Sequence, residues 1–194
     1  MTSIKPFHAT DLFDLNPINL DPLTENFYIY FYLQYLSDWP TLFYKSTSSL
    51  GTPTGYMLAK TEGQVAKKEW HAHISAVTID PNYRRIGLGS YLCTTLETYT
   101  QDEKPYFAFF IDLFVKCNNT LAINFYEKLG YSVYRRVIGY YGGSSSSLKL
   151  PNKNKLNDNT DAFDMRKSLK RDSNTECVRK NGRKHHILPQ EVGF

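Results

Sequence analysis

The chain has 194 residues and a mass of 22.5 kDa, which is enough for one domain with a tail but too little for two full domains. Hydrophobic residues make up 41% and charged residues 22%, and this ordinary globular composition excludes a wholly disordered, collagen-like or coiled-coil chain. The net charge is +4, but residues 1–149 hold thirteen basic and thirteen acidic side chains, so the whole excess lies in residues 150–194.

Cysteine usage and the early apolar run bear on the cellular compartment. The three cysteines, Cys93, Cys117 and Cys177, are odd in number and widely spaced, which suits neither a disulfide framework nor a zinc site. The apolar run at 27–36 is too short to cross a bilayer, and it follows acidic residues where a signal peptide would carry basic ones. We therefore expect a soluble cytoplasmic protein with no metal and no membrane contact.

The first half of the chain predicts one helix and three strands. Apolar residues at 23–36, opened by an Asp-Pro pair that suits a helix start, predict a helix that ends before Pro40. The segments 41–46 and 56–60 flank a Ser/Gly/Pro-rich stretch, as two strands flank a loop. Small and β-branched residues at 71–79 predict a strand that leaves the sheet at a second Asp-Pro turn.

The second half continues with alternating helices and strands. A stripe of apolar residues at helical spacing predicts a helix at 90–100, and the apolar run at 106–115 predicts a strand. Asn119 is a suitable cap for a helix at 120–129, and the glycine that follows suits a left-handed stop. The last strand or strands are expected at 131–141.

The composition changes after the last predicted strand. Residues 142–147 are Gly and Ser, and the chain beyond them is rich in Asn and Lys with few apolar residues, as in linkers and disordered segments. We expect a folded domain at 1–150, with no direct nucleic-acid binding by this core, and a basic, largely flexible tail at 151–194. The basic cluster of this tail suits either solvent or an acidic surface such as RNA. It consists of Arg179, Lys180, Arg183 and Lys184.

The segment between the strand at 71–79 and the helix at 90–100 indicates an anion site. It reads Arg84-Arg85-Ile86-Gly87-Leu88-Gly89. Glycines let a ligand approach the backbone closely, the first N–H groups of a helix lack intrahelical acceptors, and arginines add donors for phosphate oxygens. A tight turn with no ligand is the alternative. A third glycine of a Rossmann fingerprint and the Gly-Lys-Ser/Thr of a P-loop are both missing, so a diphosphate with a long arm is the ligand that fits.

Two motifs together resemble the GNAT acetyltransferases. They are Arg84-x-x-Gly87-x-Gly89 and Asn118-Asn119-x-x-Ala122-x-Asn124-Phe125-Tyr126-x-x-x-Gly130-Tyr131. Longer stretches resemble the catalytic subunits of NatB N-terminal acetyltransferases, and these are 19–25, 31–36 and 69–73. The resemblance implies an α/β GNAT fold, in which a mixed central sheet flanked by helices splays around acetyl-CoA. The pantetheine arm would lie where the strand at 71–79 parts from the strand at 106–115.

The resemblance also implies which residues touch acetyl-CoA. Most belong to the strand end and the glycine segment, and the rest belong to the helix beside the thioester. They are Val77, Thr78, Arg84, Arg85, Ile86, Gly87, Leu88, Gly89, Ser90, Asn118, Asn124 and Tyr126.

Transfer of acetyl from a thioester to an amine needs a proton acceptor and a proton donor. His73 is the expected base because of its intrinsic pKa, and Glu25 would orient the amine or relay its proton. Tyr126 is the expected general acid for the departing thiolate. The structural alternatives are a core tyrosine, a strand histidine and a carboxylate near a helix start. An acyl-cysteine on Cys117 is a competing route, but no histidine lies near it in the sequence.

The NatB resemblance implies that the substrates are nascent N-termini beginning Met-Asp, Met-Glu, Met-Asn or Met-Gln. The expected substrate-binding residues are Glu25, Phe27, Tyr28, His73, Ser75, Tyr140 and Tyr141. The first two aromatics would wall the methionine pocket, and the tyrosine pair would cover the peptide. The resemblance also implies a large helical auxiliary subunit that brings the chain to the ribosome. The apolar helix at 27–36 is the expected docking face, because contiguous exposed apolar area marks interfaces.

Two other function classes stay open on the sequence. One is a GNAT enzyme that acts on lysine or small amines, for which a more open or acidic acceptor groove is expected. The other is a non-catalytic CoA-binding scaffold, which would bind CoA without turnover.

Overall fold

The computed structural model describes residues 2–22, 24–102, 105–142 and 155–193. The chain forms two compact units. The first unit comprises Met1–Thr61 and Ala72–Phe107, and the second comprises Glu62–His71 and Ala108–Phe194. Each unit combines strands with at least one helix, so the expected α/β class is confirmed.

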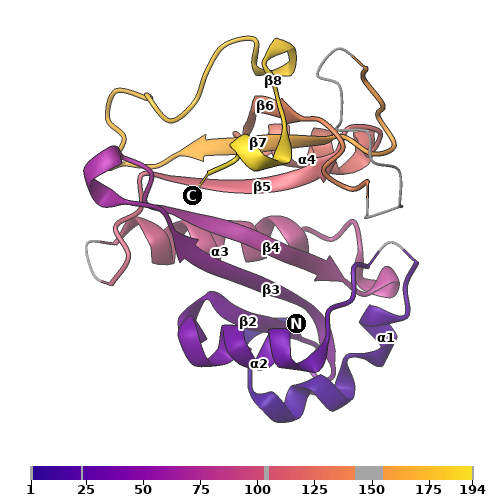
Figure 1. The fold of residues 1–194 in the computed structure, drawn as a ribbon. Helices are drawn as coiled ribbons and strands as arrows, with labels where there is room; N and C mark the ends of the chain where they lie inside the picture. The colour runs from indigo at the N-terminus through magenta and orange to yellow at the C-terminus, as the bar shows by residue number, and fades with distance from the viewer. Residues whose placement is uncertain (1, 23, 103–104, 143–154, 194) are drawn as a thin grey trace. The chain divides into compact units, whose positions relative to one another are not determined.

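The first unit is built on four neighbouring strands, which Figure 1 shows in indigo to magenta. In sheet order they are β1 (Ser3–Pro6), β2 (Phe43–Thr47), β3 (Pro53–Glu62) and β4 (His71–Ile79). β2 pairs antiparallel with both β1 and β3, which confirms the two strands expected around the Ser/Gly/Pro loop. Its helices are α1 (Asn16–Asn19), α2 (Ile29–Asp38) and α3 (Leu88–Gln101).

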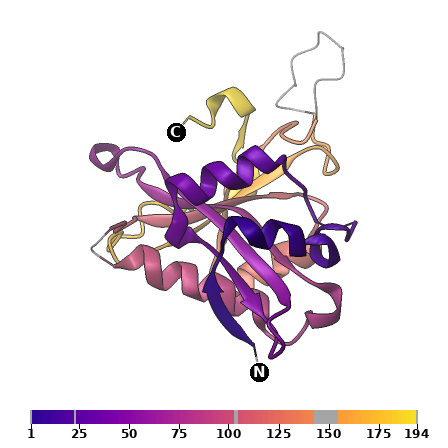
Figure 2. The ribbon, with the colours of Figure 1, turned by 90° about the horizontal axis from the view of Figure 1, so that it is seen from below.

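Helices α2 and α3 cover opposite faces of the first unit's sheet (Figure 2). Phe43 of β2 packs with Tyr32 of α2, and their ring centroids lie 6.3 Å apart. The next residue, Tyr44, donates a 2.7 Å hydrogen bond to the carbonyl of Leu92 in α3. Because successive strand residues point to opposite faces, these two contacts fix one helix on each side.

The predicted helix at 23–36 is wrong at its start. The structure has a single turn, α1, before this region, and α2 begins only at Ile29. Between them, the Thr24 hydroxyl donates to the Ile18 carbonyl at 3.1 Å, and the Asn26 amide donates to the Asn19 carbonyl at 2.8 Å. Such side-chain bonds compete with helical backbone bonds, and they keep the chain irregular here.

The second unit contains β5 (Phe110–Lys116), β7 (Ala162–Ser168), β6 (Ser132–Val137) and β8 (His186–Ile187), in this sheet order. β7 pairs antiparallel with β5 and β6, whereas β6 pairs parallel with β8, so this part of the sheet is mixed. The helix of this unit is α4 (Thr120–Lys128). Short 3-10 turns complete the chain: η1 (Ala9–Asp14), η2 (Pro40–Leu42), η3 (Val65–Lys67), η4 (Pro81–Tyr83), η5 (Gly182–Lys184) and η6 (Pro189–Glu191).

The predicted flexible tail at 151–194 is wrong for the residues that the structure describes, 155–193. β7 lies in this region and occupies a position between two other strands. Phe163 and Met165 are buried, and the charged side chains between and after them, Asp164 and Arg166, are buried as well and bond to each other. The Gly/Ser run, except for Gly142, lies outside the described residues.

The other predicted elements agree with the structure within a few residues. β4 spans the predicted 71–79, α3 contains the predicted 90–100, and α4 matches the predicted 120–129. β5 begins four residues later than expected. Across the described residues, no helix is both long and apolar enough to cross a membrane.

Candidate functional site

The loop after β4 presents backbone groups to solvent. Arg85 and Gly87 both adopt the left-handed backbone region, with φ of +67° and +90°. Gly87 precedes the first residue of α3, and within the described chain no side chain caps this helix start. The first intrahelical bond runs from the Tyr91 N–H to the Gly87 carbonyl, so the N–H groups of the first turn remain available to a ligand.

The space around this loop is open. A Cβ added at Gly87 would meet no atom within 4 Å, so the approach to the backbone is open. Arg85, Ile86 and Gly87 are exposed, whereas Leu88 is buried and anchors the helix start. Free N–H groups at a helix start, next to a cationic side chain, are the chemistry that binds phosphate oxygens.

Arg84 does not point outward as a phosphate donor in this structure. Its Nε donates to the Ile79 carbonyl at 3.0 Å, and its Nη2 donates to the Asp21 carboxylate at 2.9 Å. Asp21 lies 63 positions earlier in the chain. Sequence reasoning singled out Arg84 but used Asp21 only as a helix start, because a long-range ion pair leaves no local signal.

Strand β4 carries four more predicted site residues. His73, Ser75 and Val77 are half-buried along the strand, and Thr78 is buried. The Ser75 hydroxyl lies 2.6 Å from the Tyr35 hydroxyl of α2. The structure therefore places these four predicted residues along one strand.

The predicted methionine-pocket residues separate in the structure. Phe27 is half-buried, stacks on Phe31 at 4.5 Å and meets Tyr32 edge-on at 5.8 Å. Tyr28 is 80% exposed and stacks instead on Tyr30 at 6.0 Å. Phe27 can form an apolar wall, but Tyr28 faces away from that cluster. Glu25 is exposed in the irregular segment before α2.

An apolar groove of about 410 Å³ lies in the first unit beside α2. Its lining comes from the N-terminal turn η1, from α1 and its flanking residues, and from the start of α2. The lining residues are Ala9, Thr10, Leu12, Phe13, Leu15, Asn19, Phe27, Ile29, Tyr32 and Leu33. Phe13, Ile29 and Leu33 are exposed, so large apolar side chains face solvent along this groove.

In the second unit, α4 holds the predicted general acid. The Asn119 side chain accepts a 3.1 Å bond from the Ala122 N–H, which confirms the predicted cap. Tyr126 is buried, and its ring meets Tyr131 edge-on at 5.5 Å. Asn124 is exposed on the same helix. The geometry fixes the Tyr126 side chain on a rigid element.

The remaining predicted residues of the second unit are braced by their neighbours. The Asn118 amide donates to the Asn159 side chain at 2.8 Å, so it bonds to the C-terminal region. Tyr140 stacks on Phe114 at 4.6 Å, and the Tyr141 hydroxyl donates to the Phe114 carbonyl at 3.1 Å. Both tyrosines are thus supported by β5.

Cys117 is not suited to nucleophilic catalysis. Burial raises the pKa of this thiol to about 12, although Arg136 nearby opposes the shift. A thiol with such a pKa stays neutral at physiological pH, and the thiolate is the nucleophile. This observation weighs against the acyl-cysteine route.

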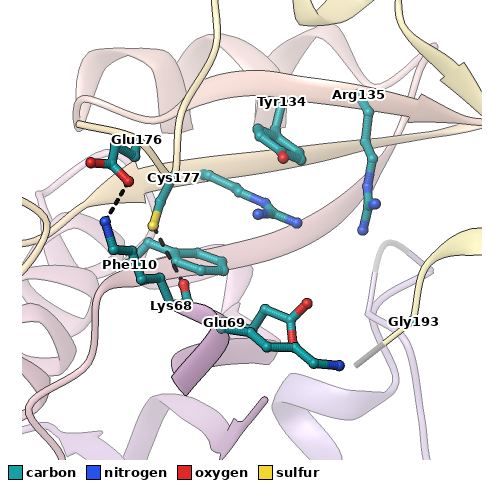
Figure 3. A pocket seen from close by; sticks show the side chains of 10 residues that line it. Lys68, Glu69, Phe110, Tyr134, Arg135, Glu176, Cys177 and Gly193 are labelled. Carbon is teal, nitrogen blue, oxygen red and sulfur yellow. Dashed lines mark hydrogen bonds and ion pairs between the residues drawn. The ribbon is translucent and has the colours of Figure 1, made fainter. Parts of the chain in front are cut away.

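A second pocket, of about 280 Å³, lies within the second unit (Figure 3). Its lining is rich in charge and aromatic rings, and comprises Lys67, Lys68, Glu69, Phe110, Tyr134, Arg135, Arg166, Glu176, Cys177 and Gly193. Lys68 pairs with Glu176 at 2.6 Å. The Arg166 guanidinium lies 3.7 Å from the centroid of Tyr134. The first contact joins the segment before β4 to the segment after β7, and the second joins β7 to β6, so both have a structural role.

Two members of the predicted basic cluster also serve the fold. The Arg179 guanidinium lies 3.8 Å from the Tyr134 ring centroid, and Arg183 bonds to Glu127 at 2.8 Å. Lys180 and Lys184 are exposed. The cluster is therefore divided between internal contacts and solvent.

Comparisons with known proteins add to this geometry. Residues 10–131 match the acetyltransferase (GNAT) family. The chain is 54% identical to the N-terminal acetyltransferase B complex catalytic subunit NAT3 of Saccharomyces cerevisiae, over 100% of both chains. It is 50% identical to the N-terminal acetyltransferase B complex catalytic subunit naa20 of Schizosaccharomyces pombe, again over 100% of both chains.

Solved structures of NatB catalytic chains are also similar to this chain. A chain of the NatB acetyltransferase complex bound to a bisubstrate inhibitor is 55% identical, with a TM-score of 0.85 and 99% of each chain covered. Chaetomium thermophilum Naa20 in complex with a bisubstrate analogue is 40% identical, with a TM-score of 0.83 and 97% of each chain covered.

Proposed function

Because this chain belongs to the GNAT acetyltransferase family, we propose that it acetylates the α-amine of nascent proteins that begin with Met-Asp, Met-Glu, Met-Asn or Met-Gln. The observation that carries the proposal is its full-length likeness to NatB catalytic subunits. The acetyl donor is acetyl-CoA, and the open Gly87 loop supports this choice because it suits a diphosphate.

We assign acetyl-CoA binding to the loop after β4 and to residues of α4. The N–H groups at the start of α3 would bind the diphosphate, and Arg85 would add positive charge. Val77 and Thr78 would contact the long arm, with Asn118 and Asn124 as further contacts. When bound, acetyl-CoA supplies an activated acetyl group as a thioester.

We assign the proton transfers to three side chains. His73 or Glu25 would take the proton of the attacking amine, whose ordinary pKa of about 7.7 to 8.0 makes this step modest. Tyr126 would donate a proton to the thiolate sulfur that leaves when the carbon–nitrogen bond has formed. Phe27 would contact the methionine side chain, and Tyr140 and Tyr141 would cover the peptide.

The auxiliary subunit of the NatB complex would dock on the apolar groove beside α2. Ile29 and Leu33 are 69% and 43% exposed along it, and contiguous exposed apolar side chains mark interaction surfaces. Their covering by a helical partner would remove this apolar area from water. Through this partner the chain would act at ribosomes in the cytoplasm.

The test uses the chain together with its auxiliary subunit. A Met-Asp peptide with an internal lysine is compared with the same peptide blocked at its α-amine, and both acetyl transfer and thiol release are measured. We expect transfer to the free α-amine and none to the blocked peptide. Acetylation of the lysine in the blocked peptide would instead support a lysine acetyltransferase, and CoA binding without thiol release would support a scaffold.

A further inference from the structure

The Arg84 side chain bonds to Asp21 and Ile79 within the first unit rather than pointing toward the open loop. It donates to the Asp21 carboxylate at 2.9 Å and to the Ile79 carbonyl at 3.0 Å. The Asp21 side chain is only 8% exposed, so the pair is partly shielded from water. We propose that Arg84 is a positioning residue that, through Asp21, holds the segment at 20–28 against the loop after β4.

The segment at 20–28 needs such an anchor. It contains neither helix nor strand among its described residues, and it carries Glu25 and Phe27. The Thr24 and Asn26 side chains bond to carbonyls only six and seven positions earlier, which shapes the segment locally. The bond between Asp21 and Arg84 spans 63 positions and connects the segment at 20–28 to a distant part of the chain.

The turn that precedes Arg84 is held by several hydrogen bonds. Asp80 accepts a 2.8 Å bond from the Asn82 N–H, and its own N–H donates to the Thr54 carbonyl at 3.0 Å. The Tyr83 N–H closes the turn on the Asp80 carbonyl at 2.8 Å. Arg84 therefore extends from a braced turn, and its side chain transmits that position to Asp21.

This inference rests on the proposed function, because it concerns the peptide and acetyl-CoA together. It differs from the expectation that Arg84 grips phosphate. If Arg84 gripped phosphate, loss of Asp21 would free its guanidinium and leave CoA binding unchanged or stronger. If Arg84 positions the segment, loss of Asp21 or of Arg84 has the same effect.

The experiment compares Asp21→Ala, Arg84→Ala and the double variant, each with the auxiliary subunit. We expect each single variant to raise the peptide KM about tenfold, the double variant to be no worse than either, and the Kd for CoA to change less than about threefold. Arg84→Lys keeps the ion pair and should restore part of the peptide KM. The proposal is overturned if Arg84→Ala weakens CoA binding tenfold while Asp21→Ala does not, or if the two effects add.

A second readout does not depend on activity. Hydrogen exchange of the amides at 20–28 should become faster in both single variants. Asp11→Ala is the matched control, because Asp11 forms a similarly shielded ion pair with Lys45 in the same unit. It should leave exchange at 20–28 unchanged. Unaltered exchange in Arg84→Ala would refute the positioning role, whereas a wild-type chain that fails to acetylate Met-Asp peptides would refute only the proposed function.

Discussion

The loop after β4 and strand β7 place charge in opposite ways. In the loop, Arg85 is exposed and the backbone of Gly87 is open, so their polar groups face solvent. In β7, Asp164 is fully buried and Arg166 is 6% exposed. The Asp164 carboxylate accepts hydrogen bonds from both Arg166 and Arg135. Polar groups thus face solvent in one region and form a buried, paired network in the other.

The largest expected effect comes from removing the centre of the β7 network. Asp164→Ala would leave Arg135 and Arg166 without their shared carboxylate, and breaking a buried pair in this way costs about 3–5 kcal/mol of unfolding free energy. Urea unfolding measures the loss. Asp158→Ala is the control, since Asp158 also binds an arginine but its side chain is 63% exposed, and it should cost no more than about 1 kcal/mol. Equal losses of unfolding free energy in Asp164→Ala and Asp158→Ala would show that the buried pair in β7 is worth no more than an exposed one.

The second prediction asks whether the second unit also contributes chemistry. Tyr126→Phe should lower kcat roughly a hundredfold, because the variant has no hydroxyl proton to give, while the affinity for acetyl-CoA changes little. Steady-state kinetics with a Met-Asp peptide measures both. Tyr131→Phe is the matched control, since Tyr131 is equally buried and packs against the same ring, and it should keep its turnover. Unchanged kcat in Tyr126→Phe would assign this tyrosine to packing alone.

The third prediction separates backbone strain from ligand contact in the loop. Gly87→Val and Gly51→Val both place a β-branched residue at a positive φ, +90° and +85°, and both sites have open space. Each variant should therefore lose about 1–2 kcal/mol of unfolding free energy. Only Gly87→Val should weaken acetyl-CoA binding, by about tenfold or more, in a calorimetric titration. A similar loss of affinity in Gly51→Val would show that strain anywhere disturbs binding.

The same contrast explains what the sequence could reveal. The Gly87 loop, the Asn119 cap and strand β4 depend on neighbours within a few positions, so pattern and spacing predicted them. β7 depends on Arg135, 29 positions from Asp164, and its alternating charges resemble a solvated tail when that partner is unknown. The Asp21–Arg84 pair leaves no local signal for the same reason: the Asp-Pro sequence suits a helix start, but the Asp21 carboxylate accepts from Arg84 instead.

The smallest expected effect is a pH dependence that arises from a buried imidazole of the second unit. His71 is fully buried and stacked on Phe110, and its Nε2 lies 3.4 Å from Asp112 and 3.7 Å from Glu62. Burial alone would lower the pKa of His71, but the two carboxylates outweigh burial and hold it above its ordinary value of about 6.5.

The folded state therefore binds the His71 proton more tightly than the unfolded state. The stabilisation that protonated His71 adds to the free energy of unfolding is complete below about pH 6.5. It is lost as the pH rises through the higher pKa of the folded state, with a slope of at most about 1.4 kcal/mol per pH unit. Urea unfolding from about pH 6 to about pH 9 should show this decline in the wild type and a flatter curve in His71→Gln. His8→Gln removes an exposed imidazole and should keep the wild-type slope. Parallel curves for wild type and His71→Gln would contradict this prediction, because they would show that the buried imidazole is neutral in the folded protein.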